Sequence, residues 1–136
     1  MRAATIIASA LLLLGCASNM EQYANNYKNN TIYGTWDEVG SKALNELVLQ
    51  EDGKFSFTAF PFETYKDYWG SYSIDRKRHR LHFTIEGGNN VPKDAKLQNV
   101  EYAFDKSGHL VLKNYYYGTV AKEVRYSLFH TFKRYP

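Results

Sequence analysis

Apolar and polar residues alternate along most of the chain after Asn30, and this alternation is the strongest constraint on the fold. A period of two puts apolar side chains on one face of a β-strand and polar side chains on the other. No long segment has the 3.6-residue period of an amphipathic helix, so we expect little or no helix. Eight strands are predicted, at residues 32–39, 45–50, 54–60, 67–74, 79–86, 98–104, 109–113 and 121–132.

The connections between these strands alternate in length. Asp52-Gly53, residues 75–78 and residues 105–108 belong to short connections, and an Asp-Gly pair suits a tight hairpin turn. The other connections are longer. Because successive connections of an up-and-down meander lie at opposite ends, all the tight turns gather at one end. The sequence therefore predicts an all-β, eight-stranded antiparallel barrel with a closed end and an open end.

Gly34-Thr35-Trp36 in the first strand resembles the Gly-x-Trp signature of the lipocalins and of lipocalin-like bacterial domains. In that family the tryptophan packs at the closed end beneath an arginine near the end of the last strand, and Arg134 is the counterpart here. A guanidinium over an indole ring contributes about 0.5–2 kcal/mol. The resemblance covers residues 32–134. It implies a small lipocalin-like lipoprotein domain, because the cysteine pair and the C-terminal helix of full-length lipocalins are missing.

The chain begins like a secretory signal peptide. Arg2 is followed by an apolar run at residues 3–14 and by the small residue Gly15. This run is shorter than the roughly 20 residues that a transmembrane helix needs. We therefore expect an export signal and not a membrane-spanning helix.

Leu13-Leu14-Gly15-Cys16 resembles the lipobox of bacterial lipoproteins. The resemblance implies cleavage before Cys16 and fatty acyl chains such as palmitate on that residue. Two or more acyl chains give durable attachment to a membrane. Because aspartate is absent at the following position, Ala17, the resemblance also implies the outer membrane, with the domain facing the periplasm.

The expected organisation has three parts. Residues 1–15 are the signal peptide, residues 16–30 are the lipidated Cys16 and a flexible Asn-rich tether, and residues 31–136 are one barrel domain. Cys16 is the only cysteine, so after acylation no thiol remains for a disulfide or a zinc site. The mature chain has 16 basic and 14 acidic residues, and this small excess does not indicate a nucleic-acid partner.

An eight-stranded barrel encloses a space that side chains can just fill, or that can hold one small ligand. One interpretation is a barrel plugged by its own aromatic rings. The other is a pocket for a small apolar or aromatic molecule, with tyrosine hydroxyls orienting the ligand. The candidate ligand-binding residues, all inward by alternation, are Trp36, Phe57, Tyr68, Tyr72, Phe83, Tyr102 and Tyr126.

Aromatic residues also gather in the connections at the predicted open end. Exposed aromatic clusters are typical of ligand entrances and of protein contact sites. Alternatively, these residues fold over the barrel as a lid. In the contact interpretation, the chain is an interaction lipoprotein, an envelope assembly factor or inhibitor with a filled barrel. The candidate interaction residues are Phe60, Phe62, Tyr65, Trp69, Tyr115, Tyr116 and Tyr117.

The densest basic patch comprises Arg76, Lys77, Arg78, His79 and Arg80, on a tight turn at the predicted closed end. One interpretation places it on anionic lipid headgroups, at about 1 kcal/mol per basic residue near a charged surface. The other is a solvated hairpin tip.

The histidines do not indicate an enzyme. His79, His82, His109 and His130 lack the i, i+4 spacing of helical zinc ligands, and neither a nucleophile elbow nor a phosphate-binding glycine loop is present. His130 has the inward parity of its strand, which fits a hydrogen-bonded core histidine or a ligand-facing one. We expect a non-catalytic protein without cofactor or metal, whose partners are the membrane and either a small apolar ligand or an envelope protein.

Overall fold

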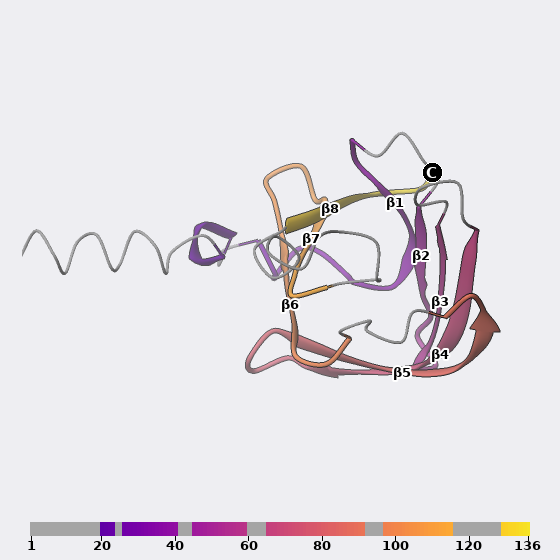
Figure 1. Ribbon diagram of the computed structural model, residues 1–136. Coiled ribbons are helices and arrows are strands. Elements are labelled where there is room, and N and C mark those ends of the chain that lie inside the picture. Colours follow the sequence, from indigo (N-terminus) through magenta and orange to yellow (C-terminus); the bar gives the residue numbers. More distant parts are fainter. Residues whose placement is uncertain (1–19, 24–25, 41–44, 60–64, 92–96, 116–128) are drawn as a thin grey trace, which may run out of the picture.

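The computed structural model describes residues 20–23, 26–40, 45–59, 65–91, 97–115 and 129–136. In these residues eight antiparallel strands form one closed barrel, in which each strand pairs with its neighbours in sequence and β8 pairs with β1 (Figure 1). The predicted fold class, an all-β up-and-down barrel, is confirmed. The strands are β1 (Gly34–Glu38), β2 (Glu46–Leu49), β3 (Lys54–Ala59), β4 (Lys66–Asp75), β5 (Arg80–Asn89), β6 (Val100–Phe104), β7 (Leu110–Lys113) and β8 (Phe129–Arg134).

The described chain contains very little helix. A single 3-10 turn, η1 (Glu21–Tyr23), precedes the barrel. None of the described helical residues forms a segment long and apolar enough to cross a membrane.

The observed strands differ from the predicted ones mainly at their ends. β4 and β5 form the longest hairpin and extend beyond the predicted ranges. β1 begins two residues later than predicted, because the chain before Gly34 crosses the end of the barrel. The predicted strand at 121–132 is described only from Phe129, and residues 116–128 lie outside the described chain.

The tight turns lie together at one end of the barrel, as predicted. The connections β2–β3, β4–β5 and β6–β7 are the short ones, at residues 50–53, 76–79 and 105–109. The start of β1 and the end of β8 lie at the same end, where Trp36 is paired with Arg134 in the ladder. We call this the closed end.

Strand alternation produces the core. In β3, for example, Phe55, Phe57 and Ala59 are buried, while Ser56 and Thr58 between them are partly exposed. Ile74 and Ile85, also inward by alternation, are only partly buried and pack against the core. The buried apolar residues of the barrel strands that alternation places inside are Trp36, Leu47, Leu49, Phe55, Phe57, Ala59, Tyr68, Tyr72, Leu81, Phe83, Val100, Tyr102, Phe104, Leu110, Leu112 and Phe132.

A β-bulge interrupts the β4–β5 pairing next to Trp69, which pairs with Gly87, whereas Gly70 pairs with Ile85. A Cβ on Gly70 would lie 1.8 Å from the carbonyl oxygen of Thr84, so only glycine fits there. Trp69 is 49% exposed and its indole lies against Gly87. Trp69 lies in β4, as the predicted strand at 67–74 had it, and alternation with the buried Tyr68 places it on the outside of the barrel. Its assignment to the open-end interaction loops is therefore wrong.

The shortest seam of the barrel joins β5 to β6, where only Arg80–Glu101 and Leu81–Val100 pair in register. Next to this pairing, the N–H of Phe83 donates to the carbonyl of Leu97 at 2.9 Å. The Arg80 guanidinium also lies 3.1 Å from the Glu101 carboxylate. The seam is thus held by few contacts, several of them from side chains.

Candidate functional site

Arg134 closes the barrel above Trp36. Its guanidinium carbon lies 4.3 Å from the centre of the indole ring, and the indole is fully buried. Its Nη1 and Nη2 groups donate to the carbonyls of Tyr33 and Thr31, each at 2.6 Å. Gly34 leaves room for this guanidinium: its φ is +141°, and a Cβ there would lie 2.3 Å from Nη1 of Arg134. The predicted contact between Trp36 and Arg134 is confirmed.

Residues 26–33 lie against the closed end. Asn26 donates a side-chain N–H to the carbonyl of Phe104 at 2.8 Å, and the Tyr27 hydroxyl donates to the carbonyl of Tyr102 at 2.7 Å. The Trp36 indole N–H donates to the carbonyl of Ile32 at 2.9 Å. The prediction of a free tether as far as residue 30 is therefore wrong for residues 26–30, because the Asn26 amide and the Tyr27 hydroxyl bind this segment to strand β6.

The Tyr27 ring stacks on His79 with centroids 3.6 Å apart and planes 5° apart, and Tyr102 meets both rings edge-on. His79 closes the β4–β5 turn with a positive φ of 55°. Burial lowers the pKa of His79 below its usual value, and the neighbouring Arg80 lowers it further. Burial likewise raises the pKa of Tyr27 to about 12. Both rings are therefore neutral at neutral pH.

A cavity of about 480 Å³ opens beside this stack, between the N-terminal segment and the closed end. The buried side chains of Ile32, Tyr102 and Phe104 contribute apolar surface to it. Among the residues that the structure describes, its lining includes two cations and no carboxylate. The lining residues are Tyr27, Lys28, Asn30, Ile32, Arg76, His79, Tyr102 and Phe104.

The charges at this cavity are largely unneutralised by the described chain. Arg76 makes one side-chain hydrogen bond there, from Nη2 to the Tyr33 hydroxyl at 3.0 Å. The ammonium of Lys28 forms no ion pair with any described residue. In the predicted basic patch, Arg76, Lys77 and Arg78 are exposed. Its other two members are engaged otherwise, since His79 stacks on Tyr27 and Arg80 pairs with Glu101.

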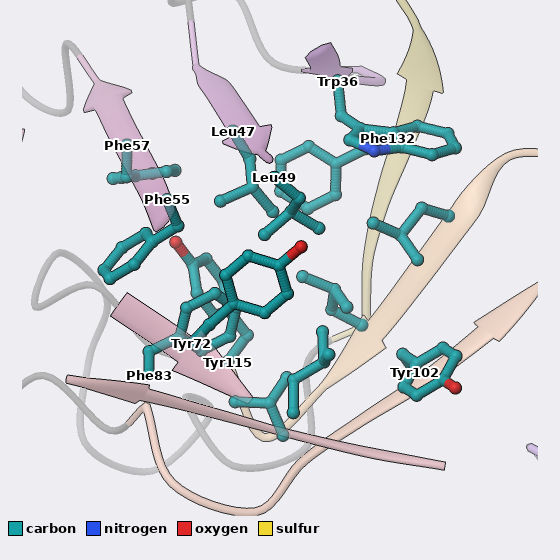
Figure 2. Packing of buried hydrophobic residues seen from close by; sticks show 14 of the residues in the cluster. Trp36, Leu47, Leu49, Phe55, Phe57, Tyr72, Phe83, Tyr102, Tyr115 and Phe132 are labelled. Carbon is teal, nitrogen blue, oxygen red and sulfur yellow. The ribbon is translucent and has the colours of Figure 1, made fainter. Parts of the chain in front are cut away.

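The predicted ligand pocket inside the barrel is filled by its own side chains. Trp36, Phe57 and Tyr68 have no exposed surface, and Tyr72 is the most exposed of the described candidates at 8%. Phe83 lies 4.8 Å from Phe55 and 6.0 Å from Tyr72, centroid to centroid, and Figure 2 shows these rings converging on one interior. Of the seven candidates, Tyr126 lies outside the described residues, and only Tyr102 lines the closed-end cavity. The described core therefore favours the plugged-barrel interpretation.

Tyr115 helps to fill the barrel. It has no exposed surface, and its ring lies 5.7 Å from that of Phe57, 5.9 Å from Phe83 and 6.4 Å from Phe132 (Figure 2). The prediction that Tyr115 belongs to an exposed interaction loop is therefore wrong. The preceding Asn114 adopts a left-handed conformation, with a φ of 65°, which breaks the strand alternation and turns Tyr115 inward.

The other predicted interaction residues are not assembled by the described chain. Tyr65 is partly exposed, and its carbonyl accepts a hydrogen bond from the Asn90 side chain at 2.9 Å. Trp69 lies on the outer face of β4. Phe60, Phe62, Tyr116 and Tyr117 lie outside the described residues.

His130 is a hydrogen-bonded core residue. Its Nδ1 lies 3.0 Å from Oε1 of Glu38, and the Asn45 amide donates to Oε2 of the same carboxylate at 2.6 Å. Sequence reasoning missed this polar cluster, although Glu38 shares the inward parity of Trp36. Elsewhere, His109 pairs with Asp105 at 3.0 Å. The residues that the structure describes contain no group of three or more His, Cys, Asp or Glu side chains that could hold a metal ion.

Sequence reasoning also missed the closed-end cavity, because half of its lining comes from residues assigned to the tether or to the edge of the first strand. The available signal was Tyr27, which with Tyr23 is one of two aromatic residues in a mostly polar segment. No family model, curated protein or solved structure matches this chain.

Proposed function

We propose that this chain is a lipoprotein anchored to the outer membrane through acylated Cys16, and that its lipocalin-like barrel is a non-catalytic binding module for a small molecule. One observation carries the proposal: the closed-end cavity has a volume of about 480 Å³ and an aromatic wall. Known ligand pockets occupy roughly 300–1,000 Å³, and the volume of this cavity falls in that range. The ligand therefore binds outside the barrel interior, against the closed end.

The path of the chain supports a position near the membrane. Asn26 is already bound to the barrel, so the chain between Cys16 and Asn26 spans at most about 35 Å when fully extended. The anchor thus holds the closed end, with its cavity and its basic turn, close to the lipid surface. The opposite end of the barrel faces away from the anchor.

The anchor is tested by labelling the whole chain with radioactive palmitate in a Gram-negative host. Wild-type protein is expected to carry the label and to sediment with outer membranes, because the acyl chains hold it there. Cys16→Ser is expected to lose the label, and Ser18→Ala is the matched control. Labelled, membrane-bound Cys16→Ser protein would contradict the proposed anchor.

The binding module is tested by mass spectrometry of residues 17–136, which contain every described residue of the barrel and the cavity. The protein is exported to the periplasm, purified gently and measured under native and then denaturing conditions. A reproducible mass difference of a few hundred daltons is expected. Matching masses would count against a carried small molecule.

The filled interior favours a second candidate function, a protein-contact lipoprotein that acts through its open end. Phe129 begins β8 at that end and is 38% exposed beneath the ammonium of Lys113, which lies 5.5 Å from its ring centre. A photo-crosslinking amino acid at position 129 should then capture an envelope protein in cells. The same amino acid at Tyr135, at the closed end, is the control, and equal capture from both positions would contradict this candidate.

A further inference from the structure

We infer that the closed-end cavity binds a phosphate-bearing amphiphile. Its phosphate lies against Lys28 and Arg76, and its apolar part lies against Ile32, Tyr102 and Phe104. The inference rests on the proposed function, in which this cavity takes a small molecule, and it adds the chemical class of that molecule.

The charges of the cavity favour an anion. In the described part of the lining, both ionised residues are cations and none is a carboxylate. Arg76 uses one N–H group for its bond to Tyr33, which leaves donors of its planar guanidinium for a bidentate contact. Lys77 and Arg78 follow on the same exposed turn and add positive potential at the entrance. The nearest acid of the turn, Asp75, accepts a hydrogen bond from the backbone N–H of Arg78 at 3.1 Å.

Phosphate fits this arrangement better than a carboxylate. A phosphate monoester carries up to two negative charges and three acceptor oxygens. A monoester can therefore accept from a guanidinium and from an ammonium on separate oxygens, with up to two charges to share between them, whereas a carboxylate has one charge. The phosphodiester of a phospholipid also has two free oxygens but one charge, so its advantage over a carboxylate is smaller than that of a monoester. The two cations come from different segments, Lys28 from the N-terminal segment and Arg76 from the β4–β5 turn, so a bridging anion joins them.

The size of the cavity indicates a ligand larger than an inorganic ion. Ile32, Tyr102 and Phe104 are each at most 5% exposed, so they contribute a small, fixed apolar surface to its wall. The cavity of about 480 Å³ is many times the roughly 30 Å³ that one water molecule occupies in the liquid. Inorganic phosphate alone would leave most of this volume to water. An aromatic or acyl group attached to the phosphate would occupy it and cover the remaining apolar surface of the wall.

Two sources supply this chemistry: the headgroup region of an anionic membrane phospholipid, or a soluble phosphate ester. The proposed anchor keeps the cavity near lipid, whereas a soluble ester would reach it from the periplasm. Both sources place a phosphate between Lys28 and Arg76, and the experiment below distinguishes the two sources.

The test follows amide and histidine-ring NMR signals of residues 17–136 during four titrations. The ligands are monomeric dihexanoyl phosphatidylglycerol, 1-naphthyl phosphate, 1-naphthol and inorganic phosphate. We expect saturable shifts at Tyr27, Arg76, His79 and Tyr102 with the first two ligands. Naphthol and inorganic phosphate are each expected to bind at least about tenfold more weakly, since each lacks one half of the interaction.

Charge is tested with the double variant Lys28→Gln/Arg76→Gln, which should weaken both phosphate-bearing amphiphiles by about tenfold or more. The matched control is Lys54→Gln/Lys133→Gln, which removes the same charge from exposed residues near the same end but outside the cavity lining. An equal loss of affinity in both double variants would overturn the inference, because the loss would then follow from the net charge of the protein and not from the cavity.

The remaining outcomes are distinguishable. Tighter binding of the phosphatidylglycerol supports a lipid source, and tighter binding of naphthyl phosphate supports a soluble ester. If naphthol binds the cavity as tightly as naphthyl phosphate, the phosphate inference is overturned and the proposed binding function stands. If none of the ligands gives saturable shifts there, both are overturned. The comparison of naphthol with naphthyl phosphate uses wild-type protein. It therefore tests the phosphate inference even if the cavity variant fails to fold.

Discussion

The guanidinium of Arg134 lies over the buried indole of Trp36 and hydrogen-bonds the carbonyls of Tyr33 and Thr31. One side chain of the last strand thereby joins the first strand and the segment before it. It also covers the tryptophan at the closed end. The stability of the barrel should depend on it more than on neighbouring exposed residues.

We expect Arg134→Ala to lower the free energy of unfolding by about 1–3 kcal/mol, from the lost cation–π contact and two charge-assisted hydrogen bonds, discounted for solvent exposure. Arg134→Lys keeps the charge but cannot reach both carbonyls, so it should recover only part of the loss. Urea unfolding measures both. The control Lys133→Ala, at the neighbouring exposed residue, should change the free energy of unfolding by less than about 0.5 kcal/mol. An equal effect of the two alanine variants would refute the stabilising role of Arg134.

Tyr115 should behave as a core residue. Removing its ring with Tyr115→Ala is expected to cost about 3–5 kcal/mol, because the cavity left among Phe57, Phe83 and Phe132 cannot collapse fully. Tyr115→Phe keeps the ring and should cost much less. Tyr135→Ala, at a 59% exposed tyrosine, is the control in the same urea experiment. Similar losses at positions 115 and 135 would show that Tyr115 does not fill the barrel.

The pKa of His79 should be below 6.5, because burial against Tyr27 favours the neutral ring. A lowered pKa in the folded state means that stability is fully present above about pH 6.5 and is lost as the pH falls through the lowered value. NMR titration of the ring protons measures the value. Tyr27→Ala should move it upward, since it removes the burial; an unchanged value would contradict this cause.

Tyr72 should give the fold a sensitivity to alkali. Burial raises its pKa to about 12, and its hydroxyl donates to the carbonyl of Gln50. Because the folded pKa exceeds that of the unfolded chain, this stability is present below about pH 10 and is lost between about pH 10 and pH 12. Urea midpoints across this range should fall less steeply for Tyr72→Phe than for wild type. Parallel slopes for the two proteins would contradict the assignment.

Much of the barrel was predictable because strand alternation is a local property. A strand such as β3 shows its inward residues directly in the order Phe55, Ser56, Phe57. The contact of Arg134 with Trp36 was predictable only through the lipocalin resemblance, since nothing local joins two residues so distant in sequence.

The candidate site was less predictable, because it depends on backbone turns that alternation does not describe. The left-handed conformation of Asn114 changes the face on which Tyr115 lies. Similarly, composition alone gives no partner for Tyr27, whose stacking depends on His79 adopting a positive φ at the end of a turn. Trp69 was assigned to the interaction residues although the predicted strand at 67–74 already contained it, and the observed β4 begins one residue earlier, at Lys66.

The hydrogen bonds of Arg134 connect residues separated by 101 and 103 positions in the chain. A nascent chain that does not yet contain Arg134 cannot form these hydrogen bonds. Barrel closure is therefore a late event of high contact order, and such topologies fold slowly. A chain emerging from the ribosome would remain open until Arg134 has been synthesised, which would suit the export in an unfolded state that the proposed membrane anchor requires.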